Sequence, residues 1–228
     1  MTVRHLIFDL DDTLYPSSSG MNSAIAYNMI SCVAQYFKVS QDEAYTLRKA
    51  SLPHFGSTLE WLMHEGFSDP EKYFSMVHPE NETDGLQKAP KLRPLLLSID
   101  IPKTILTNAP SEHAERVLAF LGVRDLFDSI TDIRACGLKG KPYPPAYRAA
   151  LAEAGGTVDD SLFIDDQLKY VIGYKNYGGI AVQVGNGGGA YQSSVIPDVC
   201  KKQSGTKEGF LYHIESVYEL PSLLKQLA

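Results

Sequence analysis

Two patterns along the chain predict an α/β fold with a doubly wound, mainly parallel sheet and an inserted helical domain. After residue 97, short apolar segments alternate with helical segments, which is typical of successive βαβ units. Residues 17–97 instead show helical spacing and no convincing strand. We therefore assign residues 1–16 and 98–228 to an α/β core, and residues 17–97 to a helical domain inserted after the first strand.

The first predicted strand, at residues 3–8, runs directly into a concentration of negative charge. It is followed at once by three carboxylates, those of Asp9, Asp11 and Asp12. Neighbouring carboxylates repel one another, and burying them is costly unless a cation lies close by. We expect Asp9 and Asp11 to be functional, and Asp12 to make a local turn hydrogen bond.

The inserted block begins with a predicted helix. Ile25, Met29, Val33 and Phe37 recur there at helical spacing. Further helices are expected at residues 41–52, 58–64 and 70–77. The aromatic residues of this block are expected to form mostly its own core.

The remaining core elements alternate along the chain. Strands are expected at residues 103–106, 129–131, 162–165 and 180–184, and helices at residues 111–121, 144–154 and 168–177. Ser111 is expected to cap the first of these helices, and Gly122 stands where a glycine often ends one. The polar residues 185–209 are expected to form a loop.

Polar side chains follow several of these strands at their carboxyl ends. They are Asp9 and Asp11, Thr107, and the pair Asp165 and Asp166. Ligands of parallel sheets bind at that edge, so we expect these side chains to form one site with Lys141, from a loop before a helix. Carboxylates are suitable ligands for Mg²⁺, which prefers oxygen.

Composition narrows the range of partners and locations. The chain has 228 residues, 44% of them hydrophobic, and a net charge of −6 with acids and bases spread along it. This balance gives no sign of a surface for a nucleic-acid polymer. Three cysteines without CxxC spacing argue against a disulfide framework. Without a signal peptide or a membrane span in the sequence, we expect a soluble, cytoplasmic protein.

The set of motifs resembles the haloacid dehalogenase (HAD) superfamily of phosphoryl-transfer enzymes. The DxDxT motif of that superfamily stands here as DLDDT at residues 9–13. Its Ser/Thr, lysine and acidic-pair motifs match Thr107, Lys141 and residues 165–166, in the same order. The resemblance covers essentially the whole chain and implies a HAD-like, Rossmann-type core in which the helical block is the cap domain.

The resemblance also implies a Mg²⁺-dependent reaction through an aspartyl-phosphate. Asp9 would attack phosphorus, and Asp11 would act first as general acid and then as general base. The metal would be held by the Asp9 side chain, the Asp11 backbone carbonyl and Asp166, with Asp165 adjacent.

The remaining motif residues would bind and orient the phosphoryl group. Thr107 and backbone N–H groups near Asn108 would hold its oxygens, while Lys141 would offset negative charge and position Asp9. The cap would close over the site and select the leaving group.

Within the superfamily, the chain resembles the pyrimidine 5′-nucleotidase subfamily, which implies substrates such as UMP and CMP. Two stretches depart from the subfamily pattern. Glu60-Trp61 stands where an arginine is usual, and QLKY at residues 167–170 replaces Ser-x-x-Asn. We expect Trp61 to stack on a nucleotide base, with the alternative that it packs in the cap core.

Other interpretations remain open. The same aspartates could serve a phosphatase for another small phosphorylated metabolite or a phosphomutase. A dehalogenase is disfavoured because that branch lacks the residue corresponding to Asp11, and the intact motif set argues against a non-catalytic binding protein. GNGGGA at residues 185–190 imitates a dinucleotide-binding motif, but no helix is expected after it. The six histidines have no ligand spacing, so they are expected to be surface or structural residues without zinc.

Overall fold

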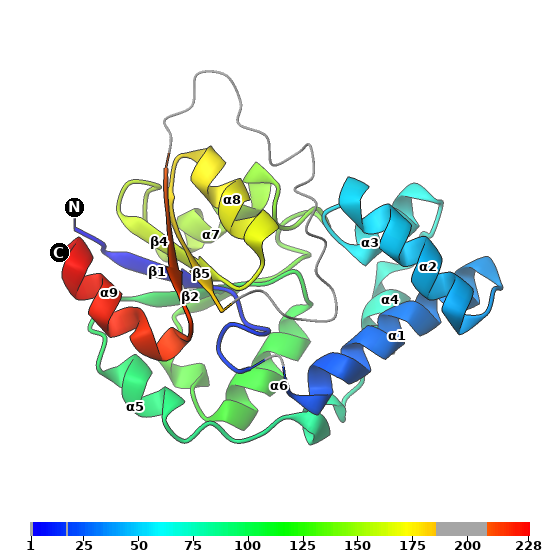
Figure 1. Cartoon of the computed structure of the whole chain (residues 1–228), viewed down its shortest axis with the longest axis horizontal. Helices are drawn as coiled ribbons and strands as arrows, with labels where there is room; N and C mark the ends of the chain where they lie inside the picture. Colours follow the sequence, from blue (N-terminus) through cyan, green and yellow to red (C-terminus); the bar gives the residue numbers. More distant parts are fainter. Residues whose placement is uncertain (1, 17, 186–208) are drawn as a thin grey trace.

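The core is a six-stranded parallel sheet in the order β3-β2-β1-β4-β5-β6, flanked by helices (Figure 1). The structure is a computed structural model that describes residues 2–16, 18–185 and 209–228. The strands are β1 (His5–Phe8), β2 (Lys103–Leu106), β3 (Ser129–Thr131), β4 (Ser161–Asp165), β5 (Ile180–Val184) and β6 (Phe210–Ile214). The predicted α/β class is confirmed.

Strand register brings the expected site residues to one edge of the sheet. The central strand β1 pairs with β2 and β4, so that Phe8 lies opposite both Ile105 and Ile164. Just beyond β1, the Asp9 N–H donates to the Ile164 carbonyl oxygen at 2.8 Å. The carboxyl ends of these three strands therefore lie side by side.

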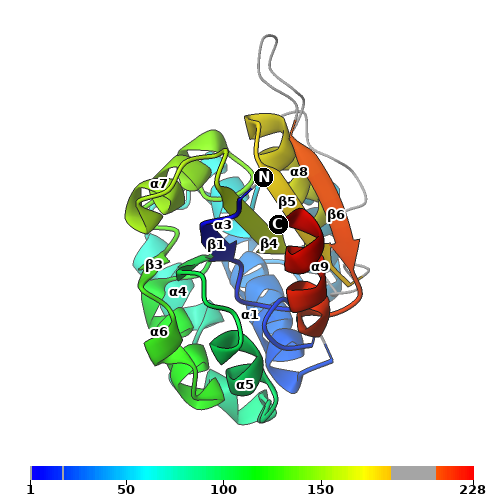
Figure 2. The same ribbon diagram turned by 90° about the vertical axis from the view of Figure 1, so that its left-hand side faces the viewer.

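Helices cover both faces of the sheet (Figure 2). α7 (Pro144–Ala154) and α8 (Leu168–Tyr177) lie on one face, and α6 (Ser111–Leu121) and α9 (Leu220–Leu227) on the other. β1 serves both layers because its side chains alternate. Leu6 and Phe8 belong to the larger apolar cluster, whereas Ile7 packs with Tyr147 and Tyr174 in the smaller one.

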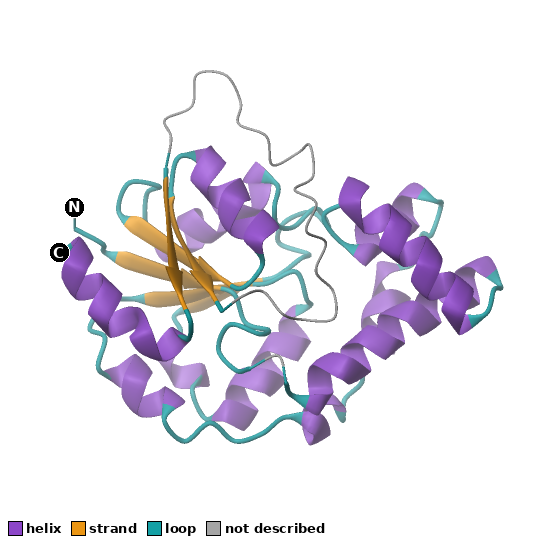
Figure 3. Ribbon diagram, viewed as in Figure 1, coloured by secondary structure: helices purple, strands orange, loops and turns teal. Residues whose placement is uncertain are grey.

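The insertion contains only helices and turns in its described part (Figure 3). We call its first four α-helices the cap. They are α1 (Gly20–Phe37), α2 (Gln41–Ser51), α3 (Thr58–His64) and α4 (Pro70–Val77), with η1 (Leu52–His54) after α2. α2, α3 and α4 are capped at their N-termini, because the side chains of Ser40, Ser57 and Asp69 each accept an N–H of the first turn.

The return from the cap passes through η2 (Glu82–Gly85) and α5 (Leu92–Leu97). α5 is attached to the core, because Arg93 donates to the Gly122 carbonyl at 2.8 Å and pairs with Asp125 at 2.6 Å. Asp125 belongs to η3 (Arg124–Leu126), directly after α6. The division of the chain at residues 17–97 stays a prediction, but the end of that range lies beside the core.

Two details differ from the sequence-based expectations. Ser111 is the first residue of α6 rather than its cap. Pro110 stands at the cap position, and the Ser111 N–H is satisfied by Asp132 at 3.0 Å. β6 was not predicted, because an edge strand with exposed apolar residues such as Phe210 lacks the alternation that marks a half-buried strand.

Some expectations fall outside the described residues. These are most of the loop expected at 185–209 and the glycine-rich motif at 185–190. A short 3-10 helix, η5 (Val217–Glu219), leads from β6 into α9. Within the part of the chain that is described, no helix combines the length and apolarity that a membrane crossing requires.

Candidate active site

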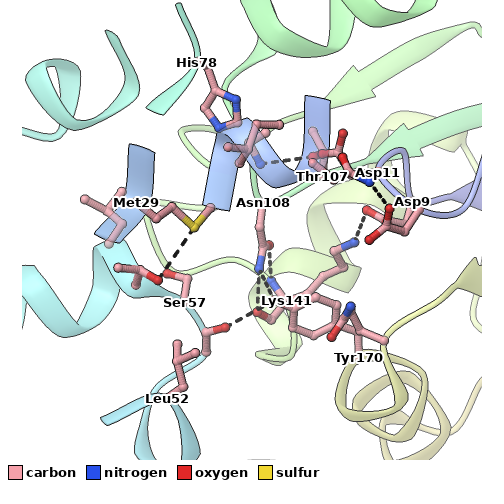
Figure 4. A pocket seen from close by; sticks show the side chains of 18 of the residues that line it. Asp9, Asp11, Met29, Leu52, Ser57, His78, Thr107, Asn108, Lys141 and Tyr170 are labelled. Carbon is pink, nitrogen blue, oxygen red and sulfur yellow. Dashed lines mark hydrogen bonds and ion pairs between the residues drawn. The ribbon is translucent and has the colours of Figure 1, made fainter. Parts of the chain in front are cut away.

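A cavity of about 170 Å³ lies between the carboxyl edge of the sheet and the cap (Figure 4). Its core side is formed by Asp9, Asp11, Thr107, Asn108, Lys141 and Asp166. Its cap side includes Ile25, Met29, Arg48, Tyr73, Phe74 and His78. The structure therefore places a charged floor opposite a more apolar wall.

Lys141 is the cation at the centre of the floor. Its side chain is 1% exposed, and its Nζ lies 2.5 Å from Asp9 Oδ1 and 2.7 Å from Asp165 Oδ2. Burial alone lowers the pKa of Lys141, but Asp165 and Asp9 outweigh it and hold the pKa above its ordinary value. Lys141 is therefore positively charged at neutral pH.

Asn108 fixes the loop that carries Lys141. Its Nδ2 donates to the Lys141 carbonyl at 2.9 Å, and the Lys141 N–H donates to Asn108 Oδ1 at 2.7 Å. A Cβ at Gly140 would lie 2.1 Å from Asn108 Oδ1, so glycine is required there. Asn108 lines the cavity as expected, but its amide is occupied with positioning Lys141 (Figure 4).

Three buried carboxylates surround this lysine. Asp9, Asp165 and Asp166 each offer an oxygen, and these atoms lie within 4.8 Å of one another. Burial and the neighbouring Asp165 raise the pKa of Asp9 to about 8, and burial raises that of Asp166 well above its ordinary value. Burial is the larger cause of both shifts, and repulsion from the neighbouring carboxylates adds to it.

The donor set fits a divalent cation. When all three carboxylates are ionised, as around a bound cation, they exceed the charge of Lys141 by two, and all three offered ligands are oxygens. Hard cations such as Mg²⁺ bind such sets. Asp9, Asp165 and Asp166 could therefore hold one metal ion.

Two further residues hold the carboxylates in place. Thr13 donates from Oγ1 to Asp9 Oδ2 at 3.3 Å and accepts the Asp166 N–H at 3.1 Å, which links the first and last motifs. Gln167 donates from Nε2 to Asp166 Oδ2 at 2.8 Å and from its N–H to Asp165 Oδ1 at 2.8 Å. Gln167 therefore supports both members of the acidic pair, although it stands where the subfamily pattern has a serine.

Thr107 and Asp11 complete the floor. Thr107 follows β2, is 1% exposed, and accepts the Ala109 N–H at 3.0 Å. The Asp11 side chain is 31% exposed, and its Oδ1 accepts hydrogen bonds from His113 Nε2 at 2.8 Å and from the Tyr15 hydroxyl. Burial opposes the change, but His113 lowers the pKa of Asp11 below its ordinary value.

Among the described residues, no local turn hydrogen bond of the Asp12 side chain is found. Its backbone is left-handed, with φ of 63°, and its carboxylate accepts from Asn22 in α1. Burial and the adjacent Asp11 raise the pKa of Asp12 to about 7. The turn signal was recognised in the sequence, but the partner comes from the cap and has no local signature.

Trp61 is not brought to the cavity. It is 4% exposed, and its ring stacks on Phe37 of α1 with centroids 5.4 Å apart. It is absent from the described residues that line the cavity. The structure therefore corresponds to the alternative in which Trp61 packs in the cap core.

Glu60 lies at the contact between cap and core. Its Oε2 accepts the Gly56 N–H at 2.7 Å, and its Oε1 accepts the Tyr143 hydroxyl of the core at 2.6 Å. Lys169 and Tyr170 of α8 donate to the Gly56 carbonyl at 2.9 and 3.2 Å. Both stretches that depart from the subfamily pattern therefore contact Gly56 at this boundary.

The fold and the site together define a Rossmann-type α/β protein with a polar cavity beneath an inserted set of helices. Residues 3–178 match the haloacid dehalogenase-like hydrolases, so the chain belongs to that family of hydrolases.

Known proteins of similar sequence and structure agree with this assignment. The "Phosphate metabolism protein 8" of Saccharomyces cerevisiae is 26% identical in an alignment of 178 positions, which covers 70% of this chain and 54% of that protein. The match therefore spans about half the length of that relative. A hydrolase from Pseudomonas syringae superposes with a TM-score of 0.66 at 21% identity, over 100% of both chains. A HAD phosphatase from Thermococcus onnurineus superposes with a TM-score of 0.58 at 18% identity, over 97% of this chain and 98% of that one. These two structures share the fold.

Proposed function

We propose that the chain is a Mg²⁺-dependent phosphomonoesterase that works through an aspartyl-phosphate. The observation that carries this proposal is the buried group of Asp9, Asp165 and Asp166 around Lys141. A nucleophilic carboxylate, a fixed ammonium and a surplus of oxygen ligands are what phosphoryl transfer to an aspartate requires.

The chain's own residues divide the reaction into two displacements. A carboxylate oxygen of Asp9 attacks phosphorus, the bond to the leaving oxygen breaks, and Asp11 gives that oxygen its proton. Water then attacks phosphorus and gives a proton to Asp11, while the bond to Asp9 breaks and phosphate leaves. The lowered pKa of Asp11 keeps this carboxyl ionised at neutral pH, which is the form that accepts a proton in the second displacement.

Other groups of the floor bind the phosphoryl oxygens and hold the nucleophile. Thr107 and Lys141 line the cavity beside Asp9, and Lys141 offsets charge as the anions meet. A Mg²⁺ ion held by Asp9, Asp166 and the Asp11 backbone carbonyl, with Asp165 adjacent, would neutralise phosphoryl charge when bound.

Nucleoside monophosphates are the substrates we propose to test first. The cap wall presents Met29, Tyr73 and Phe74, which suit an aromatic base, and Arg48, which suits polar acceptors. UMP and CMP follow from the resemblance to pyrimidine 5′-nucleotidases, and the yeast relative bears the name of a phosphate metabolism protein. Trp61, in the cap core, is no longer part of this substrate proposal.

The test is phosphate release from a panel of monoesters with Mg²⁺. The panel contains UMP, CMP, purine nucleotides, sugar phosphates and nitrophenyl phosphate, and Asp9→Asn serves as the matched inactive variant. We expect turnover by the wild type, none by Asp9→Asn, and unchanged circular dichroism, because the amide is isosteric but not nucleophilic.

Two results would contradict the proposal. Full activity in excess chelator would show that the reaction does not depend on a metal ion. Turnover by Asp9→Asn would show that it does not pass through a phosphoaspartate at this residue. Activity confined to non-nucleotide esters would keep the phosphatase and reject the nucleotide.

A further inference from the structure

A buried group of charged side chains lies behind Asp11 and has no role in the mechanism given so far. His113 of α6 is completely buried and contacts a carboxylate on each side. Its Nε2 lies 2.8 Å from Asp11 Oδ1, and its Nδ1 lies 2.8 Å from Glu82 Oε2. Both ring nitrogens are therefore engaged, which fixes the orientation of the imidazole.

Glu82 is itself held firmly. It comes from η2, on the return from the cap, and its side chain is 1% exposed. His78 Nδ1 lies 3.0 Å from Oε2, and Arg116 Nε donates to Oε1 at 2.9 Å. Burial alone would raise the pKa of Glu82, but the hydrogen bonds from His113 and His78 outweigh it and hold this pKa well below its ordinary value.

A metal ion is not the best occupant of this group. His78, Glu82 and His113 offer ligand atoms within 4.8 Å of one another. However, Arg116 is bound to the Glu82 carboxylate, and His113 is already bridged to Asp11. A divalent cation would have to displace or oppose a guanidinium group, so a hydrogen-bonded network accounts for the contacts better.

The hydrogen bonds to Asp11 are distributed unevenly between its two oxygens. His113 and Tyr15 both donate to Oδ1. Among the described residues, no hydrogen bond to Oδ2 is found. The carboxylate is therefore anchored by one oxygen, and the other remains for a proton exchanged with the substrate.

We propose that His113, supported by Glu82, is a positioning residue that orients Asp11 so that Oδ2 meets the leaving oxygen. The inference rests on the proposed phosphatase function and adds a residue to it. The order carboxylate, imidazole, carboxylate is comparable to the outer partners that orient metal ligands, whose loss typically costs about 10–100-fold in metal affinity or activity. His113 is not among the described residues that line the active-site cavity, and its hydrogen bond to Asp11 links it directly to the proposed acid–base group.

The first test compares esters of different leaving groups. In His113→Ala, kcat for alkyl and phenyl phosphates should fall about 10–100-fold. The fall should be smaller for nitrophenyl phosphate, whose leaving group hardly needs a proton. KM should change little. His113→Gln, which keeps an N–H donor, should recover part of the loss and also serves if the alanine variant folds poorly.

The second test is a double-mutant cycle. Because His113 acts through Asp11, adding His113→Ala to Asp11→Asn should lower kcat by no more than about twofold. His64→Ala is the control, since it makes the same change in a cap side chain that is 67% exposed. It should leave kcat unchanged for every ester.

The possible failures are distinguishable. An equal loss on all esters, or a full extra loss in the Asp11→Asn background, would reduce His113 to a structural residue while the phosphatase stands. A wild type that releases phosphate from no ester would overturn the proposed function, and this inference with it.

Discussion

Lys141 and His113 are two buried cations whose positions depend on carboxylates from distant parts of the chain. Lys141 lies between Asp9 and Asp165, and His113 between Asp11 and Glu82. Removing one partner of a buried pair leaves an uncompensated charge, which typically costs about 3–5 kcal/mol. We therefore expect the site residues to contribute to folding as well as to the proposed chemistry.

The pH dependence of stability should show the charge on His113. Burial alone would lower the pKa of His113, but Asp11 and Glu82 outweigh it and raise this pKa to about 10. In the unfolded chain a histidine titrates near ~6.5, so between the two values the folded state binds the extra proton. The stabilisation is fully present below the unfolded pKa, and it is lost as pH rises through the folded pKa.

The measurement is urea unfolding of the wild type and His113→Gln at about pH 6, 8 and 10. The difference in free energy of unfolding should shrink by at most about 1.4 kcal/mol per pH unit across this window. A difference that stays constant with pH would mean that His113 is neutral in the folded protein.

At the scale of elements, the cap is held by its own core and by several hydrogen bonds to the α/β core, among them those made by Glu60 and Gly56. Inside the cap, α3 packs on α1 through Trp61 and Phe37. Toward the core, Glu60 accepts the Tyr143 hydroxyl. Stability of the cap and closure of the cap are therefore carried by adjacent residues, and two substitutions can separate them.

Replacement of Trp61 should affect stability and spare specificity. Trp61→Ala should lower the free energy of unfolding by about 3–5 kcal/mol, because it leaves a cavity where the ring packs on Phe37. The ratio of turnover on a nucleotide to turnover on nitrophenyl phosphate should not change. A selective loss of nucleotide turnover would return Trp61 to the substrate site.

Tyr143→Phe should weaken closure of the cap without disturbing its fold. The variant removes only the hydroxyl that Glu60 accepts at 2.6 Å, and a hydrogen bond to a charged group is worth about 1.5–3 kcal/mol. We expect a higher KM, an unchanged circular dichroism spectrum, and faster proteolysis at the cap boundary. Glu60→Gln keeps a weaker acceptor, so its KM should lie between those of the wild type and Tyr143→Phe. An unchanged KM in both variants would contradict closure through this pair.

How much the sequence can predict differs between these elements. The strands of the central sheet and the four cap helices follow from apolar spacing, and Asp9, Lys141 and the acidic pair follow from their order along the chain. His113 and Glu82 could not be found in this way, because a lone buried histidine has no sequence signature. His113 and Glu82 are 31 positions apart in the sequence, and only the fold brings the imidazole and the carboxylate together. Trp61 was misleading for the same reason, since stacking on a base and on Phe37 require the same side chain.

At the scale of the whole molecule, the carboxylate site should couple metal binding to stability. Mg²⁺ should raise the melting temperature of the wild type, since a ligand at 100 times its Kd adds about 2.7 kcal/mol to the folded state. Asp166→Asn should abolish this increase, because it removes one of three oxygen ligands. The readout is calorimetry with and without Mg²⁺, and an equal shift in both proteins would place the ion elsewhere.

The two chain segments that join cap and core lie against each other. A Cβ at Gly85, on the return segment, would be 2.5 Å from the Met21 nitrogen at the start of α1. The two segments thus form one hinge, and when the cap opens, a cap residue moves farther the farther it lies from this hinge. Glu82 and its contact with His113 lie near the hinge, whereas α3 lies at the opposite end of the cap (Figure 1). We therefore expect an opening swing to separate Glu60 from Tyr143 while Asp11 stays aimed, so that products can leave without dismantling the acid–base group.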